Sequence, residues 1–278
     1  MTPPPASVPS PRISRRLDPS AFSALVGMAV ARLIRGRRLI LLAILSSLPV
    51  VLAALARRRL GSYNPAGTEL SLIFGLIPQT LLPLTALIFS SGMIQDEVEE
   101  QTLTYLLIRP VPRTAIYLAK LLGTLIVSAA LTITFTTLTL IVIHGGELGP
   151  AGADFPRRPL LIAGAMSLAL ATYAGLFGLA GLYFRRALVL GVAYIAVFEG
   201  ILANVDFLAR RFTIMYQFRV LTTRLLDLRP SEWSINLADA PSTSTAAASL
   251  GIAAFVLALA GGLAFSRREF RVKTPDGN

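Results

Sequence analysis

The chain has 278 residues, of which 54% are hydrophobic and only 15% are charged, and 26 Lys and Arg against 15 Asp and Glu give a formal net charge of +11. Soluble domains are roughly 45–50% apolar and about 25% charged, so this composition argues against an ordinary cytosolic enzyme and against a disordered basic protein. With no cysteine and a single histidine, His144, the sequence offers no disulfide, no thiolate ligand and no multi-histidine metal site.

Residues 1–20 form a Pro-rich start that is typical of a disordered tail. In the next segment, 21–36, Phe22 and later apolar residues recur on one face at helical spacing, and Arg32 and Arg35 lie away from that face. This pattern predicts an amphipathic helix that lies in the membrane interface before the first span.

Six apolar windows follow, and a membrane-spanning helix needs about 20 such residues. We therefore predict an all-α integral membrane protein whose six transmembrane helices cover residues 39–56, 70–94, 117–143, 159–184, 187–206 and 246–266. The six-span permease domain is expected to run over 21–269, and 270–278 is expected to be a second tail. Small residues in the fourth and sixth windows are expected to allow close helix packing.

The placement of Arg and Lys predicts the orientation of these spans. With the N-terminus in the cytoplasm, inside segments carry 16 basic residues and outside segments carry 10. The bias places both termini in the cytoplasm. No continuous basic stripe with interleaved aromatic residues occurs, so we expect membrane lipid as a partner and no nucleic acid.

The stretch between the second and third windows carries an acidic cluster on a side that is otherwise basic. Its members are Asp96, Glu97, Glu99 and Glu100. Anionic inner-leaflet lipid would repel them, so their natural partner is a positively charged protein surface. An apolar helical face of Leu103, Leu106 and Leu107 comes next, and the run Arg109-Pro110-Val111-Pro112-Arg113 ends the helix. The pattern favours a docking element; a solvated loop with scattered acids is the alternative.

This stretch resembles the cytoplasmic loop of ABC type-2 transporter permeases, the exporter membrane subunits that include the multi-copper-enzyme maturation group. The family pattern is a Glu, three residues, Gly-Thr-Leu, a Leu-Leu pair, Pro-Val, a small residue and Arg, and a Lys that opens the next span. The matching positions are Glu97, Thr102, Leu103, Leu106, Leu107, Pro110, Val111, Arg113 and Lys120, while Gln101 stands where the family usually has Gly.

The resemblance implies a coupling helix that rests in a groove of a separate ATP-binding subunit. The acidic cluster, the apolar face and the family positions together give these expected docking residues: Asp96, Glu97, Glu99, Glu100, Thr102, Leu103, Leu106, Leu107, Arg109, Pro110 and Arg113. No G-x-x-x-x-G-K-[ST] motif occurs, so ATP and Mg would be bound by the partner and this chain is expected to be no enzyme and to hold no cofactor. The expected protein is the permease of an exporter in a bacterial inner membrane, paired with a second copy or a paralogue.

Two polar residues inside predicted spans are further candidates, because an ionisable or polar group in a membrane helix is a functional hypothesis by default. Glu199 lies in the fifth window, and Gln79 follows Pro78 in the second. A structural ion pair is one role for Glu199. If it carries protons instead, the protein is a secondary proton-coupled transporter; a third alternative is a membrane anchor that transports nothing.

Residues 210–229, on the predicted outer side, combine an apolar stripe that includes Ile214 and Phe218 with several arginines, among them Arg219. One interpretation is a helix that lies on the outer leaflet. The other is a re-entrant element that gates an exit path.

Overall fold

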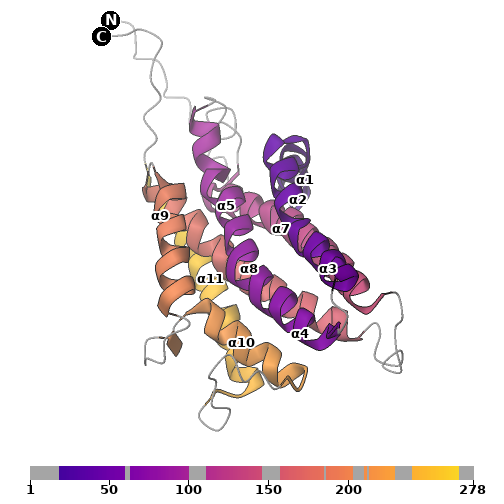
Figure 1. Ribbon diagram of the computed structural model, residues 1–278. Coiled ribbons are helices and arrows are strands. Elements are labelled where there is room, and N and C mark those ends of the chain that lie inside the picture. Colours follow the sequence, from indigo (N-terminus) through magenta and orange to yellow (C-terminus); the bar gives the residue numbers. More distant parts are fainter. Residues whose placement is uncertain are drawn as a thin grey trace, which may run out of the picture.

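The structure is a computed structural model, and it describes residues 19–59, 63–99, 111–145, 157–184, 186–202, 210–211, 213–228 and 240–268. Within these ranges the regular elements are helices (Figure 1), and two of them have π-helical geometry. In chain order they are α1 (Pro19–Arg35), α2 (Arg37–Ser46), α3 (Leu48–Arg59), α4 (Pro65–Glu69), η1 (Leu70–Leu81), α5 (Leu82–Glu99), α7 (Arg113–His144), α8 (Arg157–Tyr183), α9 (Ala187–Tyr194), η3 (Ile195–Leu202), α10 (Ile214–Leu225) and α11 (Thr243–Arg267).

Helices long and apolar enough to cross a membrane occur at five of the six predicted positions. They are Arg37–Arg58, Pro65–Asp96, Arg113–His144, Arg157–Tyr183 and Thr243–Arg267. The fifth predicted window contains a shorter apolar helix, Ala187–Ile201, and the last part of that window, 203–206, lies outside the described residues. The described part of the chain is therefore that of a helical membrane protein, and its sixth span stays a prediction.

Three prolines mark the places where long helices change direction or geometry. Pro49 follows the break between α2 and α3 at Ser47, Pro78 lies inside the π-helix η1, and Pro83 lies in the first turn of α5. Proline lacks the N–H of the helical ladder and clashes with the preceding turn, so regular α-geometry is interrupted there.

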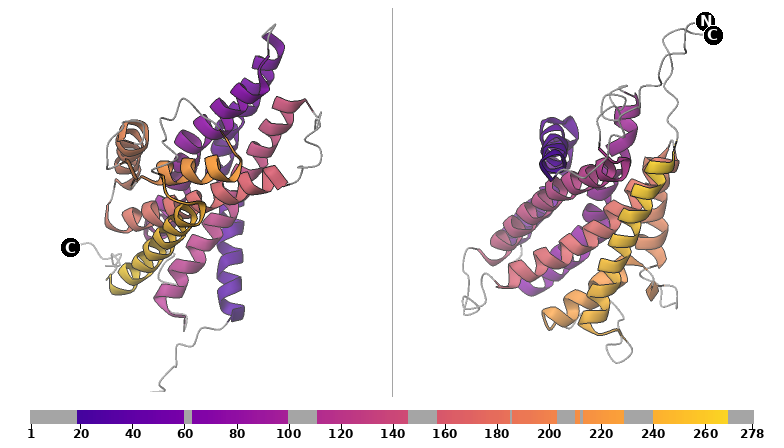
Figure 2. Two further views of the ribbon diagram at one scale, coloured as in Figure 1. Left: turned by 90° about the horizontal axis from the view of Figure 1, so that it is seen from below. Right: turned by 180° about the vertical axis from the view of Figure 1, so that it is seen from behind.

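The centre of the bundle is α8, which packs between α5 and α11 (Figures 1 and 2). Small residues make this possible. A Cβ added at Gly175 would lie 2.9 Å from Leu257 Cβ on α11, and one at Gly181 would collide with the backbone of Ser91 on α5. The small residues expected to pack do so within one chain.

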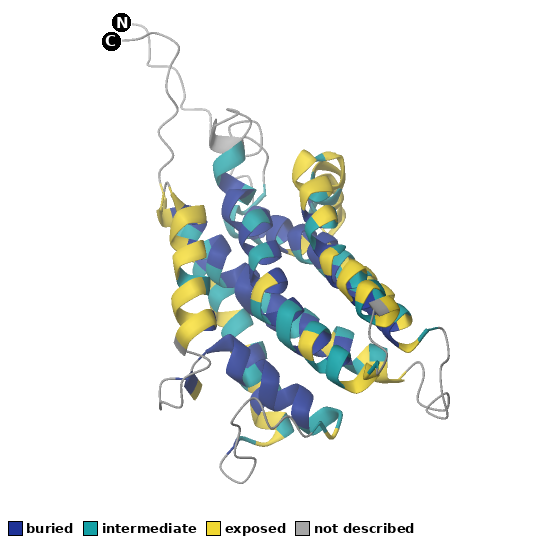
Figure 3. Ribbon diagram, in the orientation of Figure 1, coloured by how far each residue is buried: buried dark blue, intermediate teal, exposed yellow. Residues whose placement is uncertain are grey.

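The outer faces of the bundle carry large apolar side chains. Exposed surfaces cover much of α2, α3 and α9 (Figure 3), as at Ile44 and Val189, and Phe255 on α11 is also exposed. Soluble monomers rarely expose apolar surface on this scale, and lipid-facing helices do so by necessity.

The predicted amphipathic helix is α1, which packs along α7. Phe22 and Val26 contact the cluster around Leu25 and Tyr117, and a Cβ at Gly123 of α7 would lie 2.7 Å from Ala29 Cβ. The basic residues Arg32 and Arg35, placed by the sequence on the opposite face, are exposed.

The two ends of the bundle are named here after one residue each. At the Arg113 end, α5, α8 and α11 finish and α7 starts; Arg113 donates to the carbonyl oxygen of Arg268 at 3.4 Å. At the Glu69 end, α4 and α8 start and α7 finishes; Arg158 donates to Glu69 at 2.8 Å.

Candidate functional site

Most of the predicted docking residues lie outside the described part of the chain. Residues 100–110 are not described, and for 97–99 only the helical backbone of α5 is. The residues concerned are Glu97, Glu99, Glu100, Thr102, Leu103, Leu106, Leu107, Arg109 and Pro110. The docking surface itself therefore stays a prediction, while Asp96 and Arg113, which border it, can be described.

Asp96 forms an ion pair within its own chain. Its two carboxylate oxygens accept from Arg38 at the start of α2, with Oδ2 2.6 Å from Nη1 and Oδ1 3.0 Å from Nη2. Gly92, one turn earlier on α5, leaves the space that the Arg38 guanidinium fills, since a Cβ there would overlap it. The fork-like pairing joins the last turn of α5 to the first span and engages one of the four acids.

Three further side chains at the Arg113 end bind backbone carbonyl groups of neighbouring helices. Gln95 Nε2 donates to the carbonyl oxygens of Gly181 and Phe184, at 2.7 and 2.6 Å. The buried Lys120 donates to Met93 at 3.2 Å, and Arg113 reaches Arg268. The carbonyls of Gly181, Phe184 and Arg268 lie at or just beyond helix ends, where carbonyls have no helical partner and carry partial negative charge, which suits these donors. The two helices that flank residues 100–110 are thus tied to α2, α8 and α11.

Tyr117 packs these helices together one turn into α7. Its fully buried ring lies 6.2 Å from that of Phe265 on α11, measured between centroids. Side chains at Gly178 and Gly261 would collide with or crowd the tyrosine, so each glycine makes room for it. Sequence reasoning did not single out Tyr117, because only the partner helices show why two glycines face it.

Glu199, one of the two polar candidates, is fully buried in η3. Its carboxylate accepts from the Tyr194 hydroxyl at 3.3 Å and from the backbone N–H of Met215 at 3.2 Å, and the Tyr173 side chain also interacts with it. Met215 lies in the first turn of α10, where N–H groups have no helical partner and favour an anion. The carboxylate therefore holds the start of α10 against η3.

Gln79, the other candidate, belongs to the same part of the molecule. Its Oε1 accepts from Arg219 Nη2 at 3.2 Å, and the positive charge of Arg219 acts on Glu199. Arg219 lies in α10 and is only 5% exposed. The structure thus brings both candidates together through an arginine that the sequence reasoning did not select.

α10 is packed into the bundle. Nine of its 12 residues are buried, and it contacts α8, α11 and η1. This packing is not that of a helix with one face free of protein contacts, and the choice between a re-entrant element and a helix on the leaflet stays a prediction. The sequence pattern could not reveal this burial, because Arg219 lies off the apolar stripe and reads as a solvent-facing residue.

A second buried acid, Glu69, joins three elements at the Glu69 end. Its side chain is 5% exposed and pairs with Arg158 of α8 at 2.8 Å and with His144 of α7, whose Nε2 lies 3.4 Å from Oε2. Glu69 and Arg158 were not selected from the sequence, and His144 was considered there only as the single histidine. Their position at the ends of three successive windows is the signal that could have grouped them.

These features define a multi-pass membrane protein with polar contacts concentrated at its two ends. A family model described as "ABC-2 family transporter protein" matches residues 34–202, which is more than half of the chain. The chain therefore belongs to the ABC-2 transporter family, which confirms the family predicted from the sequence. No curated protein matches the sequence.

The matched region runs from the end of α1 to η3 and includes residues 95–113, Gln79 and Glu199. The chain is accordingly a membrane component of a transporter, and membership implies in general a partnership with an ABC ATP-binding subunit. α10 and α11 follow the matched region.

Proposed function

We propose that this chain is the permease subunit of an ABC exporter, and that residues 95–113 dock on a separate ATP-binding subunit. The observation that carries the proposal is the set of ties on both sides of that segment: Asp96 to Arg38, Gln95 to the end of α8, and Arg113 to the end of α11. A movement imposed on residues 95–113 would therefore reach α2, α8 and α11 through these ties, in addition to α5 and α7, which flank the segment.

The positions of the described chain ends support six crossings rather than five. Pro19 and Thr114 line one small pocket, and Arg268 contacts Arg113, so α1 begins and α11 finishes at the Arg113 end. A chain that leaves and returns to one side crosses an even number of times. Five long helices then require a sixth passage, which the apolar stretch 187–202 would supply. The segments at this end are those that carry the larger number of basic residues, so this end would be cytoplasmic.

In the proposed mechanism, ATP binding and hydrolysis by two partner subunits move the segment as a lever, and a second permease copy completes the pathway. The helices attached to the lever change their packing, and the pathway opens to one side or to the other. α10 closes the outer side, held by Glu199 and by the contact between Arg219 and Gln79. Glu199 acts here by accepting hydrogen bonds, so no proton transfer is required of it.

The test is co-purification of the permease with its ATP-binding subunit. We expect the double variant Glu97→Lys/Glu100→Lys to lose the ATPase, because the docking surface would then carry four fewer units of negative charge. The matched control is Glu147→Lys/Asp154→Lys, the same charge change in the loop expected on the other side. Retention of the ATPase by the first variant, or equal loss of the ATPase by both variants, would contradict the docking assignment.

A second experiment separates the exporter from a proton-coupled transporter. Transport into vesicles should require ATP and should continue in Glu199→Gln, since an amide oxygen still accepts from Met215. Dependence on a pH gradient, together with loss of transport in Glu199→Gln, would instead favour proton coupling.

A further inference from the structure

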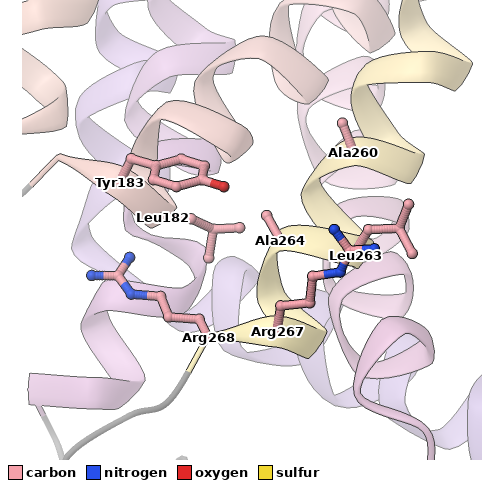
Figure 4. A pocket seen from close by; sticks show the side chains of 7 residues that line it. All are labelled: Leu182, Tyr183, Ala260, Leu263, Ala264, Arg267 and Arg268. Atoms are coloured by element: carbon pink, nitrogen blue, oxygen red, sulfur yellow. The ribbon is translucent and has the colours of Figure 1, made fainter.

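A pocket of about 580 Å³ opens between the end of α8 and the end of α11, and no step of the proposed mechanism uses it (Figure 4). Its apolar wall is formed by Leu182, Ala260, Leu263 and Ala264, and the exposed Tyr183 stands at its edge. Ala260 and Ala264 lie one turn apart on α11, and their small side chains leave the space between the two helices open.

The remaining lining residues are Arg267 and Arg268, both exposed. Figure 4 shows their side chains on either side of the apolar wall that Leu182 and Ala264 form. The residues that line the pocket, all within the described part of the chain, include no acid. The site therefore combines two positive charges at one end with an apolar surface that continues away from them.

The pocket lies where a membrane span ends. α11 is apolar up to Arg267, and exposed side chains such as Phe255, Leu259 and Leu263 run along its outer face toward the pocket. A phosphate at the membrane interface would thus meet the arginines while acyl chains follow α11, and a tyrosine at the rim suits the headgroup level.

We propose that this pocket binds an anionic phospholipid, with its phosphate between Arg267 and Arg268 and its acyl chains against Ala260 and Leu263. The proposal is independent of the docking of an ATPase. A second copy of the chain fits the site less well, because a two-fold contact at this surface would bring the arginines of both copies together.

The lipid would bind next to the start of α7. Arg113 donates to the carbonyl oxygen of Arg268, so the residue that borders the predicted docking segment also holds the peptide that follows Arg267. Occupancy of the pocket is therefore expected to stabilise the end of α11 against α7 and α8.

The experiment uses the full chain in nanodiscs of phosphatidylcholine, with and without phosphatidylglycerol that carries a photoreactive group in its acyl chain. Crosslinks should map by mass spectrometry to residues 182–183 and 260–264. Affinity for phosphatidylglycerol should fall about 25-fold in Arg267→Gln/Arg268→Gln, from roughly fivefold for each arginine near the phosphate. The control Arg58→Gln/Arg157→Gln removes two exposed arginines at the Glu69 end and should leave the affinity unchanged.

A steric variant keeps the test decisive if the arginine variant does not fold. Ala260→Phe retains both arginines and fills the apolar wall, so the crosslinks at 260–264 should be lost. Unchanged crosslinking in Ala260→Phe would overturn the proposal, and so would an equal loss of affinity in the arginine control. Crosslinks of the same yield from phosphatidylcholine that carries the same photoreactive group, used in place of phosphatidylglycerol, would also overturn it. Crosslinks between two protein copies at this surface would assign it to an oligomer interface instead.

Discussion

At the Glu69 end, a carboxylate that is 5% exposed holds an arginine and a histidine from two other helices. At the Arg113 end, the corresponding ion pair leaves 47% of Arg38 and 30% of Asp96 exposed, and the other contacts are made to carbonyl groups. Exposed pairs contribute little free energy, whereas a buried charge that loses its partner is costly. We therefore expect the contact at Glu69 to contribute more to stability than the exposed ion pair at the Arg113 end, which under the proposed function would be the one to exchange during transport.

The largest effect is expected from the buried arginine of α10. Arg219→Met removes the cation that acts on Glu199 and the donor to Gln79, and leaves a buried carboxylate. The expected loss is about 3–5 kcal/mol of stability, measured as a fall in the thermal unfolding midpoint of the solubilised protein. Arg211→Met, at an exposed position near the start of α10, is the control. Equal shifts of the unfolding midpoint in both variants would contradict the expectation that buried charge pairs contribute more stability than exposed charges.

An intermediate loss of stability is expected at the contact between Glu69 and Arg158, and burial decides which of these two residues is the more costly to replace. Arg158→Gln leaves the buried carboxylate with a weaker donor and should cost about 2 kcal/mol. Glu69→Gln should cost less, because the partners Arg158 and His144 are 45% and 40% exposed and can return to water. Unfolding midpoints of the two variants test the order. A larger shift for Glu69→Gln would show that burial does not set the strength of this contact.

The smallest change in stability, at most about 1 kcal/mol, is expected for Arg38→Gln and for Asp96→Asn. If this pair links the lever to α2, the same variants should reduce the ATP-driven transport rate severalfold, and the exchanged pair Arg38→Asp/Asp96→Arg should recover part of it. Normal transport in the single variants would remove the pair from the coupling path, while a large loss of stability would break the contrast between the two ends.

The positions of the long helices could be predicted because a membrane span must be a continuous apolar run with satisfied backbone groups. The contacts between helices could not be predicted from the sequence. Periodicity relates neighbours within one helix, but Glu69 and Arg158 belong to different helices, and Arg219 is buried only because α10 enters the bundle. Gln79 and Glu199 could be selected from the sequence because polar residues are conspicuous inside apolar windows. Arg219, which interacts with both, lies in a segment with several arginines and could not be distinguished there.

The Arg38 guanidinium occupies the position that a side chain at Gly92 would take, and this restricts the order in which residues 38, 92 and 96 can change during evolution. A side chain at position 92 displaces the Arg38 guanidinium from Asp96, so any such substitution is selected against as long as the pair is needed. Once Arg38 or Asp96 has been replaced, position 92 becomes permissive. Among descendants of this sequence, loss of the ion pair is therefore expected to precede loss of the glycine.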